Sequence, residues 1–312
     1  MSNHLRIGTR SSELALWQTY HVKALLEARF PGIVIDVLKI KTTGDKILDA
    51  PLAKIGDKGL FTKELEIALL DDRVDIAVHS YKDVPTLVPD GLTIAAVLER
   101  EDVHDVFIVN RKKSHYNFAK LPLNAMVATG SLRRKCQLLN ARPDIQIAEI
   151  RGNLNTRMKK LDSSDWDGTI LAKAGVIRLG LAERITDVLP FELMLPAVGQ
   201  GALAIESRAN DQHVQEMLRP LHHHPTAAAI TAERALLRYL EGGCQIPIGA
   251  FGQIIGKDIH LDAVIGSLDG KQIMRGKKIG TILNAEQTGF DLAKELFDRG
   301  GKEILEEIRK SS

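Results

Sequence analysis

The strongest constraint on the fold is the alternation of strand-like and helix-like segments over the first hundred residues. Helical patterns begin after Ser12 and at 61–72, and strand-like apolar stretches lie at 5–8, 33–41, 74–78 and 92–98. Pro31 and Gly32 end the first helical pattern. This βαβα order predicts an α/β lobe, and in open α/β sheets ligands bind beyond the carboxyl ends of the strands.

A second lobe of the same type is predicted from about Asp105. Its strand-like segments lie at 105–109, 125–129, 145–150 and 169–173. The glycine-interrupted stretch at 195–206 indicates a crossing between the lobes, and no internal repeat is visible. Beyond about Pro220 the pattern changes to a helix at 226–243, strands at 259–266 and 271–280, and a closing helix from about Glu286. We therefore predict an α/β protein with a third, smaller α+β domain.

Composition excludes several classes of protein. The chain has 312 residues and 44% hydrophobic residues, but no apolar run approaches the ~20 residues of a membrane span. An arginine lies where a signal peptide would need its apolar core, so we expect neither export nor anchoring. The two cysteines give no disulfide framework and no metal-ligand spacing, which fits a reducing cytoplasm. We interpret Cys136, in a helix-like segment, as a packing residue.

The net charge of +2 hides a strongly basic segment. Residues 131–160 contain eight Lys or Arg and two acidic residues, which predicts an anionic partner. A nucleic acid is disfavoured, because aromatic residues are only 4% of the chain and no helix-turn-helix or zinc signature is present. The arginines also gather at strand ends and do not line one continuous face.

Three strand ends carry arginine with a hydroxyl or amide residue close by. They are Arg10 with Ser12, Arg133 and Arg134 with Ser131, and Arg151 and Arg157 around the segment GNLN. An ordinary capped helix with a basic first turn would explain any one of them. Three together indicate a ligand with several carboxylates, because the planar fork of arginine binds a carboxylate through two hydrogen bonds.

The segment AVHSYKDVP, residues 77–85, follows a buried strand. His79, Ser80, Lys82 and Asp83 are expected to emerge at its carboxyl end, where a ligand crevice would lie. Two interpretations stay open for Lys82 and Asp83. They form a weak surface ion pair on a solvated loop, or they are an acid-base carboxylate beside an anion-binding lysine.

Two further segments point to function. Cys244 follows two glycines and precedes Pro247, so it lies on a tight turn, either without consequence or as a nucleophile or attachment point. Residues 42–61 mix glycines and charges over a length typical of binding loops, and we predict a mobile flap beside the crevice, most mobile at about 47–58.

Taken together, the motifs resemble those of the porphobilinogen deaminase family. In chain order they are RIGTRSSELALWQ, TTGD, DKGLFTKELE, DIAVHSYKDVP, GSLRRKCQL, RGNLNTR, LPAVGQGALAIE and TAERALLRYLEGGCQIPIGA. The match is nearly full length, and so many motifs in this order are highly specific.

The resemblance implies that Cys244 carries a covalent dipyrromethane cofactor through a thioether. Four porphobilinogen molecules are added to it head to tail with loss of ammonia, and water releases hydroxymethylbilane. Each pyrrole bears an acetate and a propionate, so the fully elongated enzyme carries about twelve carboxylates, which explains the many arginines.

Site residues are carried over by motif. Asp83 is the implied catalytic carboxylate, which would stabilise the azafulvenium formed as ammonia leaves and cycle a proton. The implied cofactor-binding residues besides Cys244 are Ser80, Lys82, Thr129, Ser131, Arg133, Arg134, Arg151 and Arg157. The implied substrate-binding residues are Arg10, Ser12, Phe61, Arg151, Arg157, Arg178 and Gln200, with Lys58 in the flap and no metal.

The resemblance also implies two α/β lobes like those of solute-binding proteins plus the smaller domain. The implied domains are 1–101 with 195–219, then 102–194, then 220–312. It implies a cytoplasmic monomer that binds porphobilinogen, without nucleic acid or membrane. Departures from the family pattern are Gly130 for serine, Tyr81 for methionine and Asp57 for glycine, and none touches Cys244 or Asp83.

The alternative hypothesis is a two-lobed binding or regulatory protein that closes on a small anion without chemistry. Cys244 and Asp83 separate the two, because a binding protein needs neither a thiol on a rigid turn nor a carboxylate among arginines.

Overall fold

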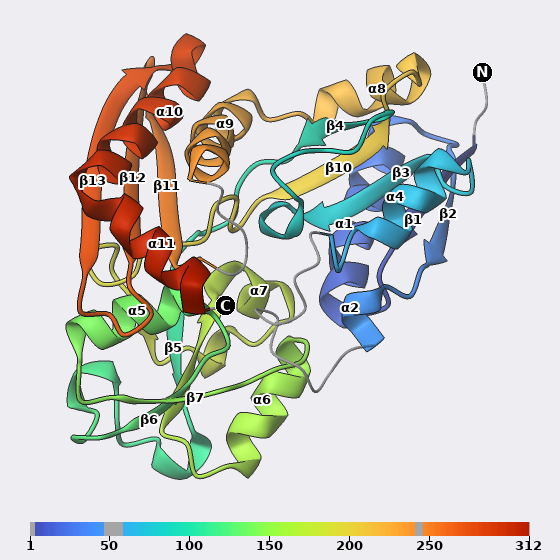
Figure 1. Cartoon of the computed structure of the whole chain (residues 1–312). Coiled ribbons are helices and arrows are strands. Elements are labelled where there is room, and N and C mark those ends of the chain that lie inside the picture. The colour runs from blue at the N-terminus through green and yellow to red at the C-terminus, as the bar shows by residue number, and fades with distance from the viewer. Residues whose placement is uncertain (1–3, 47–58, 241–245, 312) are drawn as a thin grey trace. The chain divides into compact units, whose positions relative to one another are not determined.

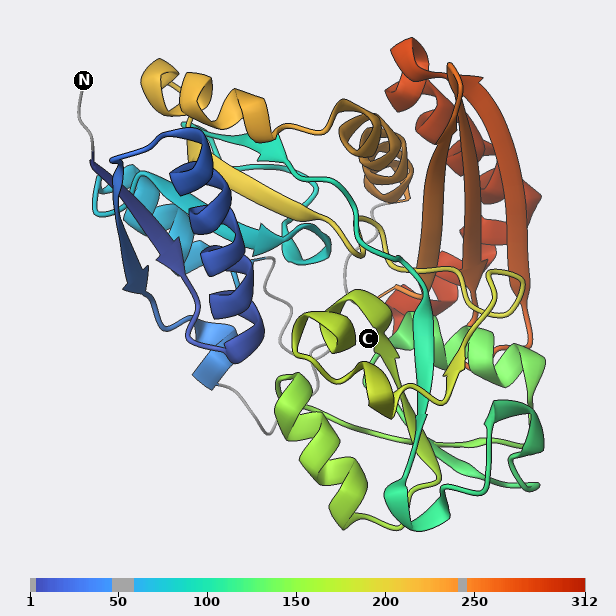
Figure 2. The same ribbon diagram turned by 180° about the vertical axis from the view of Figure 1, so that it is seen from behind.

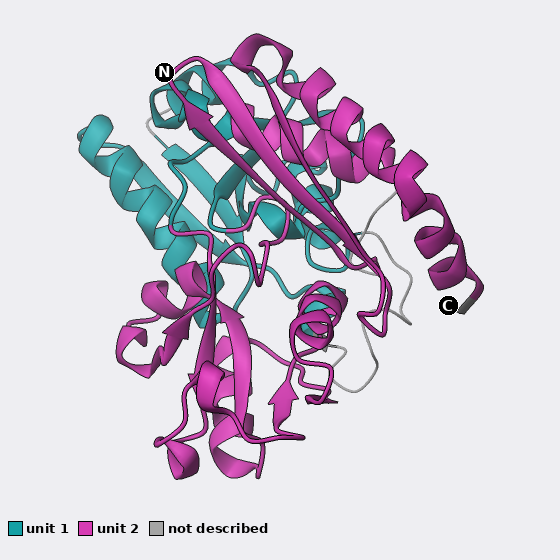
Figure 3. Cartoon of the chain, turned by 90° about the vertical axis from the view of Figure 1, so that its left-hand side faces the viewer, with its two compact units in different colours: residues 1–48, 57–101, 201–227 teal, residues 49–56, 102–200, 228–312 magenta. Residues whose placement is uncertain are grey.

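The computed structural model describes residues 4–46, 59–240 and 246–311 (Figure 1). The chain forms two compact units (Figure 3). Unit 1 comprises residues 1–48, 57–101 and 201–227, and unit 2 comprises residues 49–56, 102–200 and 228–312.

Unit 1 is an α/β lobe on one five-stranded sheet. Its elements are β1 (His4–Thr9), α1 (Glu13–Arg29), β2 (Val34–Lys39), α2 (Thr43–Lys46), α4 (Lys63–Leu70), β3 (Ile76–Ser80), β4 (Leu92–Val97), β10 (Leu203–Arg208) and α8 (Gln212–Leu218). The strand order is β2-β1-β3-β10-β4. The strands β2, β1 and β3 are parallel, and β10 runs antiparallel to both β3 and β4.

Helices cover both faces of this sheet. In Figure 1 helix α4 lies in front of the strands, and in Figure 2, seen from behind, α1 lies in front. The alternation of side chains along a strand explains the two layers. Ile76 of β3 packs with Val22 and Leu26 of α1, whereas Ala77, the next residue, packs with Leu65 of α4.

Unit 2 contains a second α/β sheet. Its elements are β5 (Asp105–Val109), β6 (Met126–Ala128), α5 (Leu132–Ala141), β7 (Gln146–Ala148), α6 (Leu154–Ser163), β8 (Gly168–Ala172), α7 (Lys173–Arg178) and β9 (Asp187–Val188). The order is β7-β6-β8-β5-β9, with β7, β6 and β8 parallel and β5 antiparallel to β8 and β9. This is the pattern of directions found in unit 1, so the topology repeats although the sequence shows no repeat.

The rest of unit 2 is an antiparallel sheet packed with helices. Its elements are β11 (Ile248–Ile255), β12 (Asp258–Gly266), β13 (Ile273–Thr281), α10 (Ala285–Leu296) and α11 (Lys302–Ser311), with α9 (His224–Tyr239) leading into it. Leu236 of α9, Leu261 of β12 and Leu292 of α10 belong to one buried cluster. The predicted α/β class with a smaller sheet-and-helix part is confirmed.

Two predictions for this C-terminal region were incomplete. Strand β11 was not predicted, because its segment IGAFGQII contains two glycines. Those glycines allow close packing, since a Cβ on Gly252 would lie 2.9 Å from the Ala229 carbonyl oxygen of α9. The single closing helix is in fact two helices, α10 and α11, separated where Gly300 adopts a φ of 124°.

The glycine-interrupted stretch at 195–206, predicted as a crossing between the lobes, leads into a strand of unit 1. Its second half enters β10, which inserts between β3 and β4 in the sheet of unit 1. The Leu98 amide donates to the Leu203 carbonyl at 3.0 Å, just beyond the end of β4. The predicted boundaries of three domains stay a prediction, because compactness divides the chain into two units.

Candidate active site

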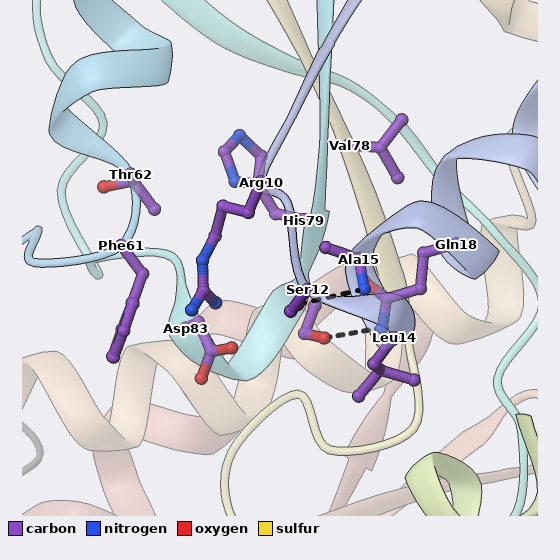
Figure 4. Close-up of a pocket in the computed structure, with 11 residues that line it drawn as sticks. Arg10, Ser12, Leu14, Ala15, Gln18, Phe61, Thr62, Val78, His79 and Asp83 are labelled. Carbon is purple, nitrogen blue, oxygen red and sulfur yellow. Dashed lines mark hydrogen bonds between the residues drawn. The ribbon is translucent and has the colours of Figure 1, made fainter. Parts of the chain in front are cut away.

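A pocket in unit 1 lies where β1 and β3 end. These strands are parallel neighbours, paired at Ile7 and Ile76, so their carboxyl ends meet at one edge of the sheet. The pocket is lined by Arg10, Ser12, Leu14, Ala15, Gln18, Phe61, Thr62, Val78, His79, Ser80 and Asp83 (Figure 4). The structure therefore brings together Arg10, Ser12, Phe61, Ser80 and Asp83, five residues predicted from the sequence.

The start of α1 fixes one wall of the pocket. Ser12 is the N-cap of the helix, and its Oγ accepts a hydrogen bond from the Ala15 amide at 3.3 Å. One turn later, the Gln18 side-chain amide donates to Ser80 Oγ at 2.7 Å, which ties α1 to the end of β3. Both serine hydroxyls are therefore held in place at the edge of the pocket.

Arg10 reaches into the pocket from the end of β1. Its Nη2 and Nε donate to the two carboxylate oxygens of Asp45, at 2.5 and 3.3 Å. Its guanidinium carbon lies 4.1 Å from the centre of the Phe61 ring. Burial raises the pKa of Asp45, but hydrogen bonds and charge from Arg10 outweigh burial and hold this pKa below its ordinary value.

Asp83 lies on a 3-10 turn, Tyr81–Asp83, directly after β3. Its side chain is half-buried and belongs to the pocket lining, whereas Lys82 is exposed. Figure 4 shows the Asp83 carboxylate below the Arg10 guanidinium, in the part of the pocket that Ser12 also borders. The pocket thus combines one acidic group with a cation and hydroxyls.

His79 lines the pocket as predicted, but it lies within β3 and does not emerge beyond it. Its side chain is buried, and its Nε2 lies 3.0 Å from Glu206 Oε2 of β10. Glu66 of α4 is a third buried ionisable group here. Burial and the charge of Glu206 raise the pKa of Glu66. A layer of titratable groups therefore lies beneath the pocket, and no sequence pattern indicated it.

In unit 2 the turns after β6 and β7 lie against each other. The Thr129 amide donates to the Ala148 carbonyl at 2.9 Å, and Ser131 caps α5 by accepting from the Arg134 amide at 3.4 Å. A Cβ on Gly130 would lie 2.7 Å from the Ile150 carbonyl oxygen. The departure to glycine at this position therefore matches a backbone approach that leaves no room for a side chain.

Arg133 and Arg134 point into the interior of unit 2. Their Nη1 and Nη2 groups donate to the two carboxylate oxygens of Asp105, at 2.7 and 2.8 Å. Gln200 Nε2 donates to Asp105 at 3.0 Å. Asp105 is fully buried, and although burial favours its neutral form, the two guanidinium charges hold its pKa well below the ordinary value. The sequence did not indicate Asp105.

The remaining basic candidates of unit 2 lie near the second sheet. Arg151 is half-buried, and burial lowers its pKa while the Glu149 charge opposes that effect. Arg157 Nε donates to the Gly152 carbonyl at 2.8 Å, which folds its side chain back over the turn. Arg178 is buried at the end of α7. Lys58, Asp57, the predicted flap at 47–58 and Cys244 lie outside the described residues.

Cys136 is buried in α5, as predicted for a packing residue, and burial raises the pKa of its thiol to about 12. In the described parts of the chain, no group of three His, Cys, Asp or Glu side chains could hold a metal ion. Within the same residues, no helix is both long and apolar enough to cross a membrane.

Comparison with known proteins gives two family matches. The model for porphobilinogen deaminase, dipyromethane cofactor binding domain, matches residues 5–216, and that for porphobilinogen deaminase, C-terminal domain, matches residues 227–298. Similar solved structures include the methionine binding protein MetQ, with 13% identity, a TM-score of 0.44 and coverage of 70% of this chain and 90% of that one. The aliphatic sulphonate binding protein SsuA from Escherichia coli has 16% identity, a TM-score of 0.41 and coverage of 77% and 71%.

Proposed function

This chain belongs to the porphobilinogen deaminase family, and from that premise we propose which of its residues carry out the reaction. The family is that of hydroxymethylbilane synthase, a transferase of tetrapyrrole biosynthesis. The chain accordingly condenses four porphobilinogens head to tail onto a dipyrromethane primer, loses ammonia at each addition and releases hydroxymethylbilane by hydrolysis. The alternative of a binding protein without chemistry is set aside on this ground.

Asp83 is the catalytic carboxylate in this proposal. The observation that carries it is the shared pocket, where Asp83 lies with Arg10 and Ser12 at the meeting strand ends. Porphobilinogen carries two carboxylates, which Arg10 and Ser12 would bind, and a pyrrole N–H. A carboxylate oxygen of Asp83 would accept from that N–H and stabilise the positive charge that develops as ammonia leaves. Its other role is to take the proton that the attacked ring carbon loses.

The donor groups of unit 2 fit a dipyrromethane with its four carboxylates. Around the turns after β6 and β7 lie the hydroxyls of Thr129 and Ser131 and the guanidinium of Arg151, all hydrogen-bond donors to a carboxylate. We assign to the cofactor Ser80, Lys82, Thr129, Ser131, Arg133, Arg134, Arg151 and Arg157, with Cys244 as its covalent anchor. When bound, the dipyrromethane supplies the free pyrrole carbon to which the first substrate is joined.

Arg133 and Arg134 can give only part of their N–H groups to the cofactor. Each donates to Asp105, and Arg133 Nη1 also donates to the Leu195 carbonyl and Arg134 Nη1 to the Ile170 carbonyl, so few of their N–H groups are left for a cofactor carboxylate. Substrate contacts in the proposal come from Arg10, Ser12 and Phe61 in the pocket, and from Arg151, Arg157, Arg178 and Gln200 in unit 2.

The proposal extends to the state of the protein in the cell. We expect a monomer that works in the cytoplasm and binds neither nucleic acid nor membrane. The support is the sequence: few aromatic residues, cysteines without a disulfide framework, and arginines assigned to a polycarboxylate ligand. A salt-independent elution volume at the monomer mass would agree with it, and retention on DNA would contradict it.

Intact mass spectrometry tests the anchored cofactor. The purified protein should exceed its sequence mass by roughly 420 Da, about two pyrrole units, and Cys244→Ser should lack this excess. Cys136→Ser is the matched control and should keep the adduct, because that thiol is buried. An adduct that survives Cys244→Ser would contradict the assignment.

Substitution of Asp83 tests the catalytic role. Asp83→Asn and Asp83→Glu should fold with an unchanged thermal midpoint but lose most turnover, about a hundredfold or more for Asn. Asp90→Asn, an exposed carboxylate on the loop that follows, is the control and should turn over normally. Near-normal rates from Asp83→Asn would remove Asp83 from the mechanism.

A further inference from the structure

The motif TTGD, residues 42–45, lies next to the pocket but contributes no residue to its lining. It spans the start of α2. Thr43 and Gly44 hydrogen-bond to Glu64 and Leu60, Asp45 accepts from Arg10, and Thr42 donates to Asp45. The sequence placed this motif at the start of the predicted flap, but in the structure it forms part of α2 and is hydrogen-bonded to Leu60 and Glu64. The proposed reaction gives it no role, so its contacts need another explanation.

Thr43 and Gly44 dock the motif against the first turn of α4 and the residues just before it. The Thr43 amide and hydroxyl both donate to Glu64 Oε1, at 2.8 and 2.5 Å. The Gly44 amide donates to the Leu60 carbonyl at 2.8 Å. A Cβ at Gly44 would lie 2.2 Å from the Phe61 ring, so a glycine is required for the ring to lie where it does.

Thr42 and Asp45 complete the arrangement. Thr42 is fully buried, and its hydroxyl donates to Asp45 Oδ2 at 2.8 Å. Asp45 therefore has little freedom, and its two oxygens meet the Nε and Nη2 edge of Arg10. Phe61 covers one flat face of the same guanidinium. The motif thus fixes Arg10 both along one edge and on one face.

A guanidinium has a second two-donor edge, formed by Nη1 and the other hydrogen of Nη2. In Figure 4 the guanidinium points into the pocket, with Phe61 on one side and Ser12 on the other. An arginine held in this way has already lost the side-chain freedom that binding would otherwise remove, so a carboxylate that meets its open edge binds more tightly.

We propose that Asp45 is a positioning residue, which orients Arg10 so that its open edge binds a carboxylate of porphobilinogen. This inference rests on the proposed function, because it needs Arg10 to contact the substrate. Asp45 itself contacts no substrate in the proposal; it acts through Arg10. Thr42 supports it by fixing the Asp45 carboxylate.

The test is a double-mutant cycle on the holoenzyme, with initial rates of porphobilinogen consumption measured against its concentration. Asp45→Asn removes the charge that holds Arg10, and it should raise KM about tenfold while kcat changes less than about threefold. In an Arg10→Lys background, where the fork is absent, Asp45→Asn should change KM less than about twofold. Asp72→Asn is the control, since Asp72 pairs with Arg6 on the same sheet but outside the pocket, and it should leave KM unchanged.

Several outcomes would overturn the proposal. An unchanged KM in Asp45→Asn would refute positioning, and a lowered KM would show that Asp45 competes with the substrate for Arg10. If Asp45→Asn raises KM by the same factor in the Arg10→Lys background, Asp45 has a merely structural role. If Asp45→Asn does not fold, Thr42→Val should raise KM in the same direction by a smaller factor, and its failure to do so counts against the proposal. A wild-type holoenzyme that consumes no porphobilinogen would instead refute the proposed function itself.

Discussion

Replacing Asp105 by Asn should destabilise unit 2 more than any exposed charge does. The Asp105 carboxylate is fully buried and accepts from Arg133, Arg134 and Gln200 at 2.7, 2.8 and 3.0 Å. Hydrogen bonds to charged groups contribute about 1.5–3 kcal/mol each, so the two from Arg133 and Arg134 together stabilise the fold by about 3–6 kcal/mol. The amide oxygen of Asn recovers about 1 kcal/mol, so we expect a loss of about 2–5 kcal/mol, which overlaps the range of about 3–5 kcal/mol for a broken buried ion pair.

Urea unfolding, followed by circular dichroism, measures this loss. Asp144→Asn is the control, since Asp144 also accepts two hydrogen bonds from Arg142, both at 2.8 Å, but lies at the surface, where we expect no measurable change. Because the pKa of Asp105 is depressed in the folded state, its contribution is present above the unfolded pKa of about 4 and is lost only as pH falls through the lower folded value. The difference between variant and wild type should therefore be constant from about pH 5 to 8. A loss below about 1 kcal/mol, or an equal loss in Asp144→Asn, would refute the reasoning.

Two further predictions concern Glu66 and Gly130. The folded-state pKa of Glu66 is raised, so the wild-type protein loses stability as pH rises through that value. Glu66→Gln lacks this titration, and its thermal midpoint should rise relative to that of wild type between about pH 4 and pH 8. Parallel pH profiles of the two thermal midpoints would contradict this. Gly130→Ala would place a Cβ 2.7 Å from the Ile150 carbonyl and should cost about 1–3 kcal/mol in urea unfolding, because the two turns must separate. An unchanged midpoint would show that the Ile150 turn yields freely.

Much of the pocket could be predicted from the sequence, and the reason is topological. A βαβ order makes β1 and β3 parallel, so the residues that follow them reach one edge of one sheet. Ser12 could be predicted as a helix cap because capping depends only on the local sequence. The position of β10 in the sheet could not be predicted from the sequence, because its insertion between β3 and β4 depends on contacts between residues more than a hundred positions apart.

The partners of the charged groups were harder to predict. His79 follows three apolar residues of β3, and only the register of β10 against β3 places Glu206 beside it. Glu66 lies on a helix with an ordinary charge pattern, and its burial follows from the packing of α4 on the sheet. Such pairs become visible only once the layers are assembled, because no local spacing encodes them.

Two of the three arginine sites differ for a reason that concerns helix geometry. Arg10 precedes the N-cap Ser12, so its side chain stays at the strand end, free to reach the pocket and Asp45. Arg133 and Arg134 follow the N-cap Ser131 and belong to the first turn of α5, so the phase of the helix decides where they point. That phase places them on the buried face with Gln137 and Leu138, against Asp105 at the start of β5. The same motif of arginine beside a capping serine thus yields a cation that lines the pocket when the arginine comes before the cap and a buried ion pair when it comes after.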